Sequence, residues 1–286
     1  MRHLTWFVSL SAIFSSCLSR KIVDENSQEA LWEAVKHRYV QWNVSIIGGD
    51  VNRPPRRGTF LKVVCTSDTH ANLIKIMDRI PNGDVLIHAG DFTNLGTIEQ
   101  IEEFDALMGT LPHRHKLVIA GNHELGFDET ENLEMRRTKY RDNGTEFGYE
   151  LLGNVTYLQD SHFEIDGLVF YGSPWHPLKG YPFYRPRHLI GKEWSRIKRK
   201  IDVLITHIPP LGYMDLYPPV ERWGDFALLN RVTDLRPRFH VFGHNHYNFG
   251  AQSNGPTTFM NVASKNGLTG DYNAPLVFYI ATNLSR

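Results

Sequence analysis

Residues 61–70 read LKVVCTSDTH, and residues 85–91 read VLIHAGD. Each stretch passes directly from a short hydrophobic run to a polar cluster, Ser67 to His70 in the first and Gly90-Asp91 in the second. A short apolar run bounded by turn residues is typical of a buried strand. Because the same transition recurs three more times along the chain, we predict buried strands with polar residues at their carboxyl ends.

The predicted strands alternate with segments that show helical spacing of apolar residues. The strands are Leu61 to Thr66, Val85 to Ala89, Lys116 to Ala120, Asp202 to Thr206 and His240 to Phe242, and the helices are Asn72 to Arg79, Ile98 to Leu111 and Phe226 to Leu235. After Asn154 the short strands Val155 to Leu158, Phe163 to Ile165 and Leu168 to Tyr171 indicate a second, partly antiparallel sheet. The expected fold class is α/β, a two-sheet β-sandwich flanked by helices.

The chain is predicted to divide into an N-terminal extension, residues 1–58, and one catalytic domain, residues 59–286. The extension closes with RPPRRG at residues 53–58, a composition that breaks regular structure. Its apolar stretch from Leu4 to Leu18 follows a basic start and is a candidate secretory signal. We favour a cytoplasmic location, with secretion as the alternative. Past this stretch no tract is long and apolar enough to span a membrane.

The charge balance argues against a polymeric anion as partner. Lys plus Arg number 31 and Asp plus Glu number 31, so the formal net charge is zero. A protein that binds the phosphate backbone of a nucleic acid normally carries a positive field. We therefore expect a small phosphate ester or nucleotide rather than a nucleic-acid polymer. The two cysteines exclude a disulfide framework, whereas 14 histidines are available as metal ligands.

A polar cluster follows each of five predicted strands. The clusters are Ser67-Asp68-Thr69-His70, Gly90-Asp91, Gly121-Asn122-His123-Glu124, Thr206-His207 and Gly243-His244-Asn245-His246. Any one of them alone is more often only a turn. Five at successive strand ends favour a binding site, because ligands of α/β sheets collect at the carboxyl ends of strands. Asp, Asn and His donors without Cys suit Mn²⁺, Fe, Zn²⁺ or Mg²⁺.

These blocks resemble the calcineurin-like metallophosphoesterases, whose pattern is D-x-H, G-D, G-N-H-D/E, H and G-H-x-H. The resemblance extends from about Lys62 to Ile280. Three further blocks, at residues 83–93, 171–175 and 209–212, are similar to the metallophosphoesterase-domain-containing subgroup of that family. The resemblance implies hydrolysis of a phosphate ester at two divalent metal ions, of which we favour manganese.

The same resemblance implies seven metal ligands, three for each ion and one shared between the ions. One ion is bound by Asp68, His70 and His246, the other by Asn122, His207 and His244, and Asp91 bridges the two. A carboxylate suits the bridge because it has two oxygens and a formal charge. Asn122 is also implied to contact the substrate phosphate, and His123 to be a catalytic histidine that binds no metal and lies near the leaving group. The implied nucleophile is a hydroxide between the ions.

The activity we expect is that of a phosphodiesterase acting on small phosphodiesters or cyclic nucleotides. The alternatives are a phosphomonoesterase and a non-catalytic scaffold that binds metal or nucleotide. Two positions depart from the family pattern. Asn94 stands where a second carboxylate often orients the catalytic histidine, and we expect its side chain to accept a hydrogen bond from His123. Ile208 replaces a usual glycine and is expected to narrow substrate access.

The sequence leaves the roles of three other residues open. His88 lies within an apolar strand, and we interpret it as a core histidine or one that supports a ligand. Trp175 and His176 follow a Gly-Ser-Pro turn, where they form either a base-stacking platform or part of the packed domain edge.

Overall fold

The computed structural model describes residues 27–197 and 200–282. The candidate signal from Leu4 to Leu18 lies outside these residues. In the described part of the chain, none of the helices has both the length and the hydrophobicity needed to cross a membrane.

Short helices and strands make up most of the described chain. The α-helices are α1 (Gln28–Val35), α2 (Ile98–Thr110), α3 (Leu133–Tyr140), α4 (Arg187–Trp194) and α5 (Phe226–Leu235), and the 3₁₀ helices are η2 (Lys36–Arg38), η3 (Leu73–Lys75), η4 (Met77–Arg79) and η5 (Gly148–Leu151). The strands are β1 (Trp42–Asn43), β2 (Phe60–Thr66), β3 (Val85–His88), β4 (His115–Val118), β5 (Thr156–Tyr157), β6 (Ser161–Ile165), β7 (Leu168–Ser173), β8 (Val203–Thr206), β9 (Leu216–Tyr217), β10 (Glu221–Arg222), β11 (Phe239–Phe242), β12 (Gly250–Ser253), β13 (Thr258–Asn261) and β14 (Leu276–Ala281).

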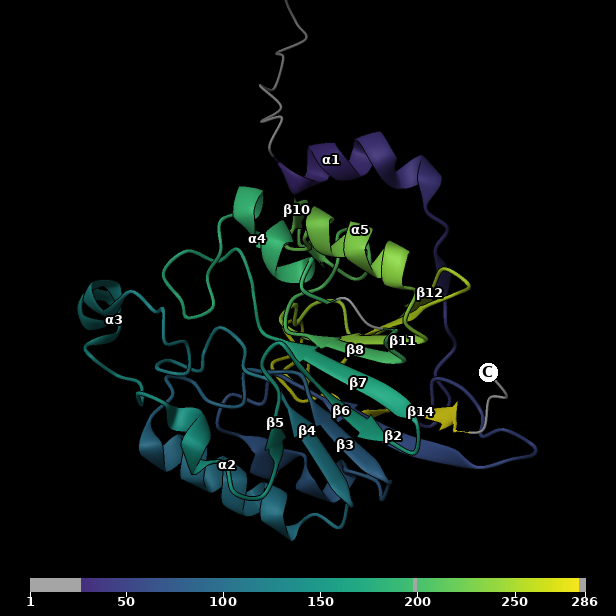
Figure 1. Ribbon diagram of the computed structural model, residues 1–286, viewed down its shortest axis with the longest axis horizontal. Coiled ribbons are helices and arrows are strands. Elements are labelled where there is room, and N and C mark those ends of the chain that lie inside the picture. Colours follow the sequence, from purple (N-terminus) through teal and green to yellow (C-terminus); the bar gives the residue numbers. More distant parts are fainter. Residues whose placement is uncertain (1–26, 198–199, 283–286) are drawn as a thin grey trace, which may run out of the picture.

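Two sheets face each other and form a sandwich (Figure 1). The first has the strand order β14-β2-β3-β4-β5 and is parallel except for β14. The second has the order β1-β12-β13-β11-β8-β7-β6, with parallel pairing of β7, β8, β11 and β13 at its centre. The expected α/β sandwich flanked by helices is confirmed.

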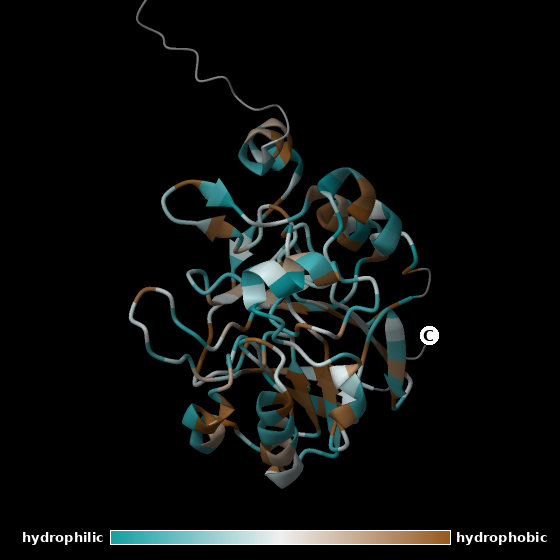
Figure 2. Ribbon diagram, turned by 90° about the vertical axis from the view of Figure 1, so that its left-hand side faces the viewer, coloured by the Kyte–Doolittle hydropathy of each residue, from teal (hydrophilic) through white to brown (hydrophobic). Residues whose placement is uncertain are grey.

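Side chains alternate between the two faces of each strand, so the strands contribute to two hydrophobic clusters. One face of each sheet contributes to the layer between the sheets, which includes Val63, Ile87, Leu117, Phe170, Val203 and Val241. The opposite faces meet the helices in a second hydrophobic cluster, to which α2 contributes Ile101 and Phe104 and α5 contributes Leu228 and Val232. Helix α2 covers the first sheet, and α4 and α5 cover the second (Figure 1). Hydrophobic residues accordingly concentrate in the strands (Figure 2).

Two details of the predicted secondary structure are wrong. Residues 72–79 do not form one α-helix but the two 3₁₀ turns η3 and η4. The segment is short, and Ile80 must be extended because Pro81 follows it. In addition, the predicted strand Val155 to Leu158 belongs to the first sheet, where β5 pairs with β4 in parallel, and not to the second.

The described part of the N-terminal extension packs against the domain. Trp32 of α1 is 5% exposed, and its ring lies so close to Gly212 that a Cβ there would clash. The side chain of Asn52 exchanges two hydrogen bonds with the main chain of Tyr279 in β14. The boundary at residue 58 therefore separates sequence motifs, and an independent domain boundary there stays a prediction.

Candidate metal centre

The polar clusters meet at one edge of the sandwich. Asp68 follows β2, Asp91 follows β3, and Asn122 lies four residues past the end of β4 in the first sheet. The second sheet contributes His207 after β8, and it contributes His244 and His246 after β11. The carboxyl ends of parallel strands meet at one edge of each sheet, and the sandwich brings the two edges together. All seven predicted ligands therefore converge, although they come from two sheets.

The backbone at these positions adopts an uncommon conformation. The φ angles of Asp68, His70, Asp91 and His244 are 51°, 46°, 54° and 65°. Residues other than glycine rarely adopt such positive values, and they cluster at functional sites where the surroundings enforce them. Gly90 has a φ of 93°, and a Cβ on it would lie 2.7 Å from Nδ1 of His207. The glycine before Asp91 is therefore required by the packing of the site.

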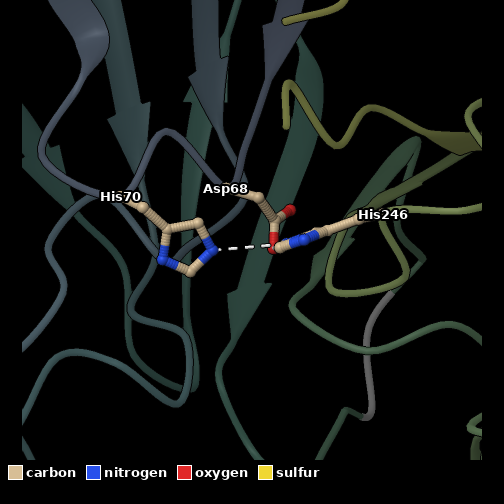
Figure 3. A group of neighbouring side chains, drawn as sticks. All are labelled: Asp68, His70 and His246. Atoms are coloured by element: carbon tan, nitrogen blue, oxygen red, sulfur yellow. Dashed lines mark hydrogen bonds and ion pairs between the residues drawn. The ribbon is translucent and has the colours of Figure 1, made fainter. Parts of the chain in front are cut away.

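Asp68, His70 and His246 form the first group of converging side chains (Figure 3). The two Nε2 atoms of His70 and His246 lie 3.2 Å apart, and Nε2 of His246 lies 3.2 Å from Oδ1 of Asp68. Asp68 is held by hydrogen bonds from the hydroxyl of Ser67 and the main-chain N–H of His244. These contacts fix the carboxylate between the first sheet and the loop after β11.

Asp91, His207 and His244 form a second group. Nε2 of His207 lies 3.4 Å from Oδ2 of Asp91 and 3.0 Å from Oδ1 of Asn122. Oδ2 of Asp91 also lies 3.8 Å from Nε2 of His70, so the carboxylate stands between the two groups. Its other oxygen, Oδ1, accepts a hydrogen bond from the main-chain N–H of His123.

The tautomer of His207 follows from its partner. Nδ1 of His207 lies 3.0 Å from the carbonyl oxygen of Ala89, which can only accept, so Nδ1 carries a proton. Nε2 thereby faces Asp91 and Asn122. Burial lowers the pKa of His207, but the charge of Asp91 and the hydrogen bond with it outweigh burial and raise the pKa to about 9. A cation at this Nε2 must therefore displace a proton.

The buried carboxylates are held in the ionised form. Burial opposes the charge of Asp68, yet the hydrogen bond and charge of His246 hold its pKa below the usual range. Burial also opposes the charge of Asp91, and the charges of His207 and His123 lower its pKa nevertheless. Burial lowers the pKa of His70 to about 4 and that of His244 to about 3. Ionised carboxylates and neutral imidazoles are the states that bind metal ions.

His123 lies beside both groups. Its Nδ1 is 2.7 Å from the main-chain carbonyl oxygen of Asn94, and its ring is 4.8 Å from that of His70. The expected hydrogen bond to the side chain of Asn94 is therefore wrong, because the main chain accepts it. The side-chain amide of Asn94 instead donates to the carbonyl oxygen of His70. His70, Asp91 and His123 also satisfy the spacing of a metal group, so geometry alone leaves open whether His123 binds an ion.

Two buried residues support the ligands from behind. Glu124 accepts hydrogen bonds from the N–H groups of Asp91, Thr93 and Gly121 and from the hydroxyl of Thr93. Burial and the charge of Asp91 nonetheless raise its pKa to about 7. His88 lies in the core, and its Nε2 is 3.0 Å from the hydroxyl of Thr69, between the two ligands Asp68 and His70. The interpretation of His88 as a supporting core histidine is confirmed.

Five of the seven ligands line a pocket with about 610 Å³ of empty space, part of it open solvent, and aromatic rings form part of its wall. Tyr181, Trp223 and Tyr247 line it together with Leu178. The ring of Tyr181 lies 5.7 Å from that of His123, and the ring of Trp223 lies 5.0 Å from that of His244. Sequence reasoning missed these rings. They lie on irregular segments and next to a two-residue strand, where neither periodicity nor a motif identifies them.

Three residues considered from the sequence do not line this pocket. Ile208 is fully buried in the core, so the expected narrowing of substrate access is wrong. The indole N–H of Trp175 donates to Asp160, and its ring packs against Phe183. His176 is fully buried as well. The packed domain edge is therefore the correct reading of Trp175 and His176.

The donor set fits divalent cations. The Nε2 atoms of His70 and His246 lie 3.2 Å apart, and that of His246 also contacts the carboxylate of Asp68, so the two nitrogens need either a shared proton or a cation between them. Two buried carboxylates together with neutral imidazoles offer the O and N donors that Mn²⁺, Fe and Zn²⁺ accept.

Comparisons with known proteins agree with this geometry. The family described as calcineurin-like phosphoesterase matches residues 61–248. A UPF0046 protein of Caenorhabditis elegans is 48% identical over 90% of this chain and 89% of its own length. Metallophosphoesterase domain-containing protein 1 of Homo sapiens is 39% identical over 82% of this chain and 74% of its own. One solved structure, at 16% identity, has a TM-score of 0.53 and covers 71% of this chain and 90% of that chain.

Proposed function

This chain belongs to the calcineurin-like phosphoesterase family as a metal-dependent phosphoesterase, and on that premise we propose that it hydrolyses small phosphodiesters. The observation that carries the choice of a diester is the pair of aromatic walls beside the candidate metal centre. Tyr181 stands next to His123, and Trp223 stands next to His244. A diester has an organic group on each side of its phosphorus, and each wall can receive one.

The charge of the pocket supports the same choice. Of the ten described residues that line it, none is Lys or Arg. A phosphomonoester carries a second negative charge near neutral pH, since its second pKa is about 6. A diester carries only one negative charge, so its binding requires less positive charge on the protein. The balanced overall charge likewise offers no attraction for a nucleic-acid polymer, and we propose a small ester or nucleotide as the substrate.

We assign the seven converging side chains to two divalent ions, with manganese favoured. Asp68, His70 and His246 would hold one ion, Asn122, His207 and His244 would hold the other, and Asp91 stands between the groups. Bound there, the ions would lower the pKa of a water molecule and neutralise charge on the attacking and leaving oxygens.

The remaining steps fall to the residues of this chain. The amide of Asn122 is placed to orient a phosphate oxygen beside Asp91. Because Nδ1 of His123 donates to Asn94, the other nitrogen, Nε2, is the atom that can give a proton to the leaving oxygen. Leu178, Tyr181 and Trp223 line the pocket and would displace part of the water around a bound ester.

The decisive experiment compares bis(4-nitrophenyl) phosphate with 4-nitrophenyl phosphate at equal Mn²⁺ concentration. We expect kcat/KM for the diester to exceed that for the monoester by at least about 10-fold, since only the diester fills both walls. A preference for the monoester would make the chain a phosphomonoesterase. Turnover of neither ester, in protein that binds metal, would favour the non-catalytic scaffold.

A further inference from the structure

A second pocket opens on the far side of Tyr181 from the metal ligands. It has about 480 Å³ of empty space, part of it open solvent, and is lined by Met135 of α3, by residues of the chain before α3, and by the loop at residues 179–184. The lining residues are Asp128, Thr130, Glu131, Asn132, Met135, Lys179, Gly180, Tyr181 and Tyr184. Tyr181 is the residue that this pocket shares with the pocket of the candidate metal centre. We call the second pocket the α3 pocket.

We propose that the α3 pocket is the subsite for the leaving group of the substrate and that it accepts a planar aromatic group. The proposal rests on the phosphodiesterase function above and adds to it the direction in which the substrate lies.

The position of Tyr181 gives the direction. Its ring lies 5.7 Å from the ring of His123, the residue whose Nε2 is available to protonate the leaving oxygen. A leaving group next to His123 is therefore also next to Tyr181. A leaving group that extends past the edge of this ring would reach the α3 pocket, whereas the group on the side of His244 meets Trp223 instead.

The ring of Tyr181 is held in place by α3. The ammonium of Lys139 lies 4.0 Å from the centroid of this ring, and the ring of Tyr140 lies 5.5 Å from it. A cation over an aromatic face stabilises that arrangement. The wall between the two pockets is thus a positioned ring, with one face covered by Lys139 and other atoms exposed to both pockets.

The lining explains the preference for a planar aromatic group. Tyr181 and Tyr184 provide flat rings and Met135 provides a polarisable thioether, and both kinds of group favour aromatic rings. Met135 is packed against the loop, because a Cβ on Gly180 would lie 2.7 Å from its sulfur. The carboxylates of Asp128 and Glu131 already accept hydrogen bonds from the protein, so they are not free acceptors for a ligand.

The test varies only the leaving group. Methyl 4-nitrophenyl phosphate and methyl 4-methylumbelliferyl phosphate share the methyl group but release a one-ring or a two-ring phenol. The measured quantity is the ratio of kcat/KM for the two-ring ester to that for the one-ring ester, in Mn²⁺-loaded full-length protein. Met135→Trp fills the α3 pocket. The matched control is Leu133→Trp, which changes an exposed residue on the same helix that does not line the pocket.

We expect the ratio to exceed one in the wild type and to fall about 10-fold in Met135→Trp. Tyr184→Leu, which removes a ring without filling space, is expected to lower the ratio about 2- to 10-fold. The control is expected to retain the wild-type ratio. Tyr184→Leu also covers the case in which Met135→Trp does not fold.

A ratio that both pocket variants leave unchanged would overturn the subsite, and so would a ratio that only Trp223→Leu lowers. Hydrolysis of neither ester by the wild type would instead count against the phosphodiesterase function. In that case, binding of free 4-methylumbelliferone, followed by its fluorescence, tests the pocket alone. Binding that Met135→Trp abolishes supports the subsite, and absence of binding to the wild type refutes it.

Discussion

Nδ1 of His123 lies 2.7 Å from the main-chain carbonyl oxygen of Asn94. A carbonyl oxygen can only accept, so the proton of the neutral imidazole resides on Nδ1, and Nε2 faces the pocket with a free lone pair. In the protonated ring, Nε2 carries the second proton and can donate it to a leaving oxygen. We therefore predict that His123→Ala lowers turnover by about 10²- to 10⁴-fold while metal content changes little.

Elemental analysis and kinetics on the same preparation check this prediction. The defect should shrink for esters with acidic leaving groups, because such groups need little protonation. A defect that is independent of the leaving-group pKa would indicate that His123 stabilises charge on the phosphoryl oxygens instead. Loss of metal in parallel with turnover would show that His123 is a ligand of the group with His70 and Asp91.

Asn94→Ala should be far milder than His123→Ala. The substitution removes the side-chain hydrogen bond to the carbonyl oxygen of His70 but keeps the main-chain carbonyl that orients His123. We expect kcat to fall less than about 10-fold, in keeping with the loss of one partly exposed hydrogen bond. The dependence of kcat/KM on the leaving-group pKa is the additional readout. If Asn94→Ala changed this dependence as His123→Ala does, the side chain of Asn94 would be needed to position the imidazole.

Asp91→Asn should impair activity more than His88→Asn. The first change removes the negative charge that stands between the two groups of ligands, whereas the second loses a contact to the hydroxyl of Thr69. We expect about a 10- to 100-fold effect for His88→Asn and a larger one for Asp91→Asn. Rates and metal content of both folded variants decide the order. A reversed order would place the metal centre elsewhere.

The ligands could be predicted from the sequence because each directly follows a strand or a tight turn next to one. The glycine before Asp91 and the glycine before His244 mark these turns in the chain itself. The sheet to which a strand belongs is harder to predict, because it depends on pairing with strands that are distant in the sequence. β5 joins β4 in the first sheet, although its spacing along the chain resembles that of β6 and β7.

The aromatic rings that line the pocket could not be predicted from the sequence, because their positions also depend on contacts between distant parts of the chain. Tyr181 reaches His123 across 58 positions of the chain, and Trp223 reaches His244 across 21. Both lie outside the regular elements, where side-chain positions depend on tertiary contacts rather than on a repeating pattern. The hydrogen bond from His123 to the main chain of Asn94 had no sequence signature either, since any residue at position 94 has a main-chain carbonyl group.

Removal of metal should destabilise the fold. Asp68 and Asp91 are 0% and 2% exposed and lie in a common cluster, so cations offset the repulsion of two buried negative charges. We predict two ions per chain and a lower Tm in chelator, because an ion at about 100 times its Kd stabilises the folded state by about 2.7 kcal/mol. Scanning calorimetry with and without Mn²⁺ measures the difference. Saturation at one ion per chain with full activity would refute the assignment of two.

Glu124→Gln should weaken both stability and catalysis, although Glu124 does not line the pocket. Its carboxylate accepts four hydrogen bonds at 2.6 to 3.0 Å, from Asp91, Thr93 and Gly121, and it is fully buried. The amide of Gln turns an N–H₂ group toward donors that can no longer be satisfied. Each buried donor left unpaired costs about 1 to 3 kcal/mol, so we expect a loss of that order in the free energy of unfolding.

Catalysis should fall because the same bonds fix the main chain of Asp91 and the turn that carries Asn122 and His123. Denaturant titration of the metal-free protein measures stability, and metal titration measures the affinity of the site. Glu102→Gln is the matched control, since Glu102 is exposed on α2 and the same substitution there changes charge without unpairing buried groups. If Glu124→Gln matched this control in both stability and metal affinity, the four hydrogen bonds would not be what positions Asp91. A loss of metal affinity that exceeds the loss of stability would instead identify Glu124 as the residue that orients the shared carboxylate.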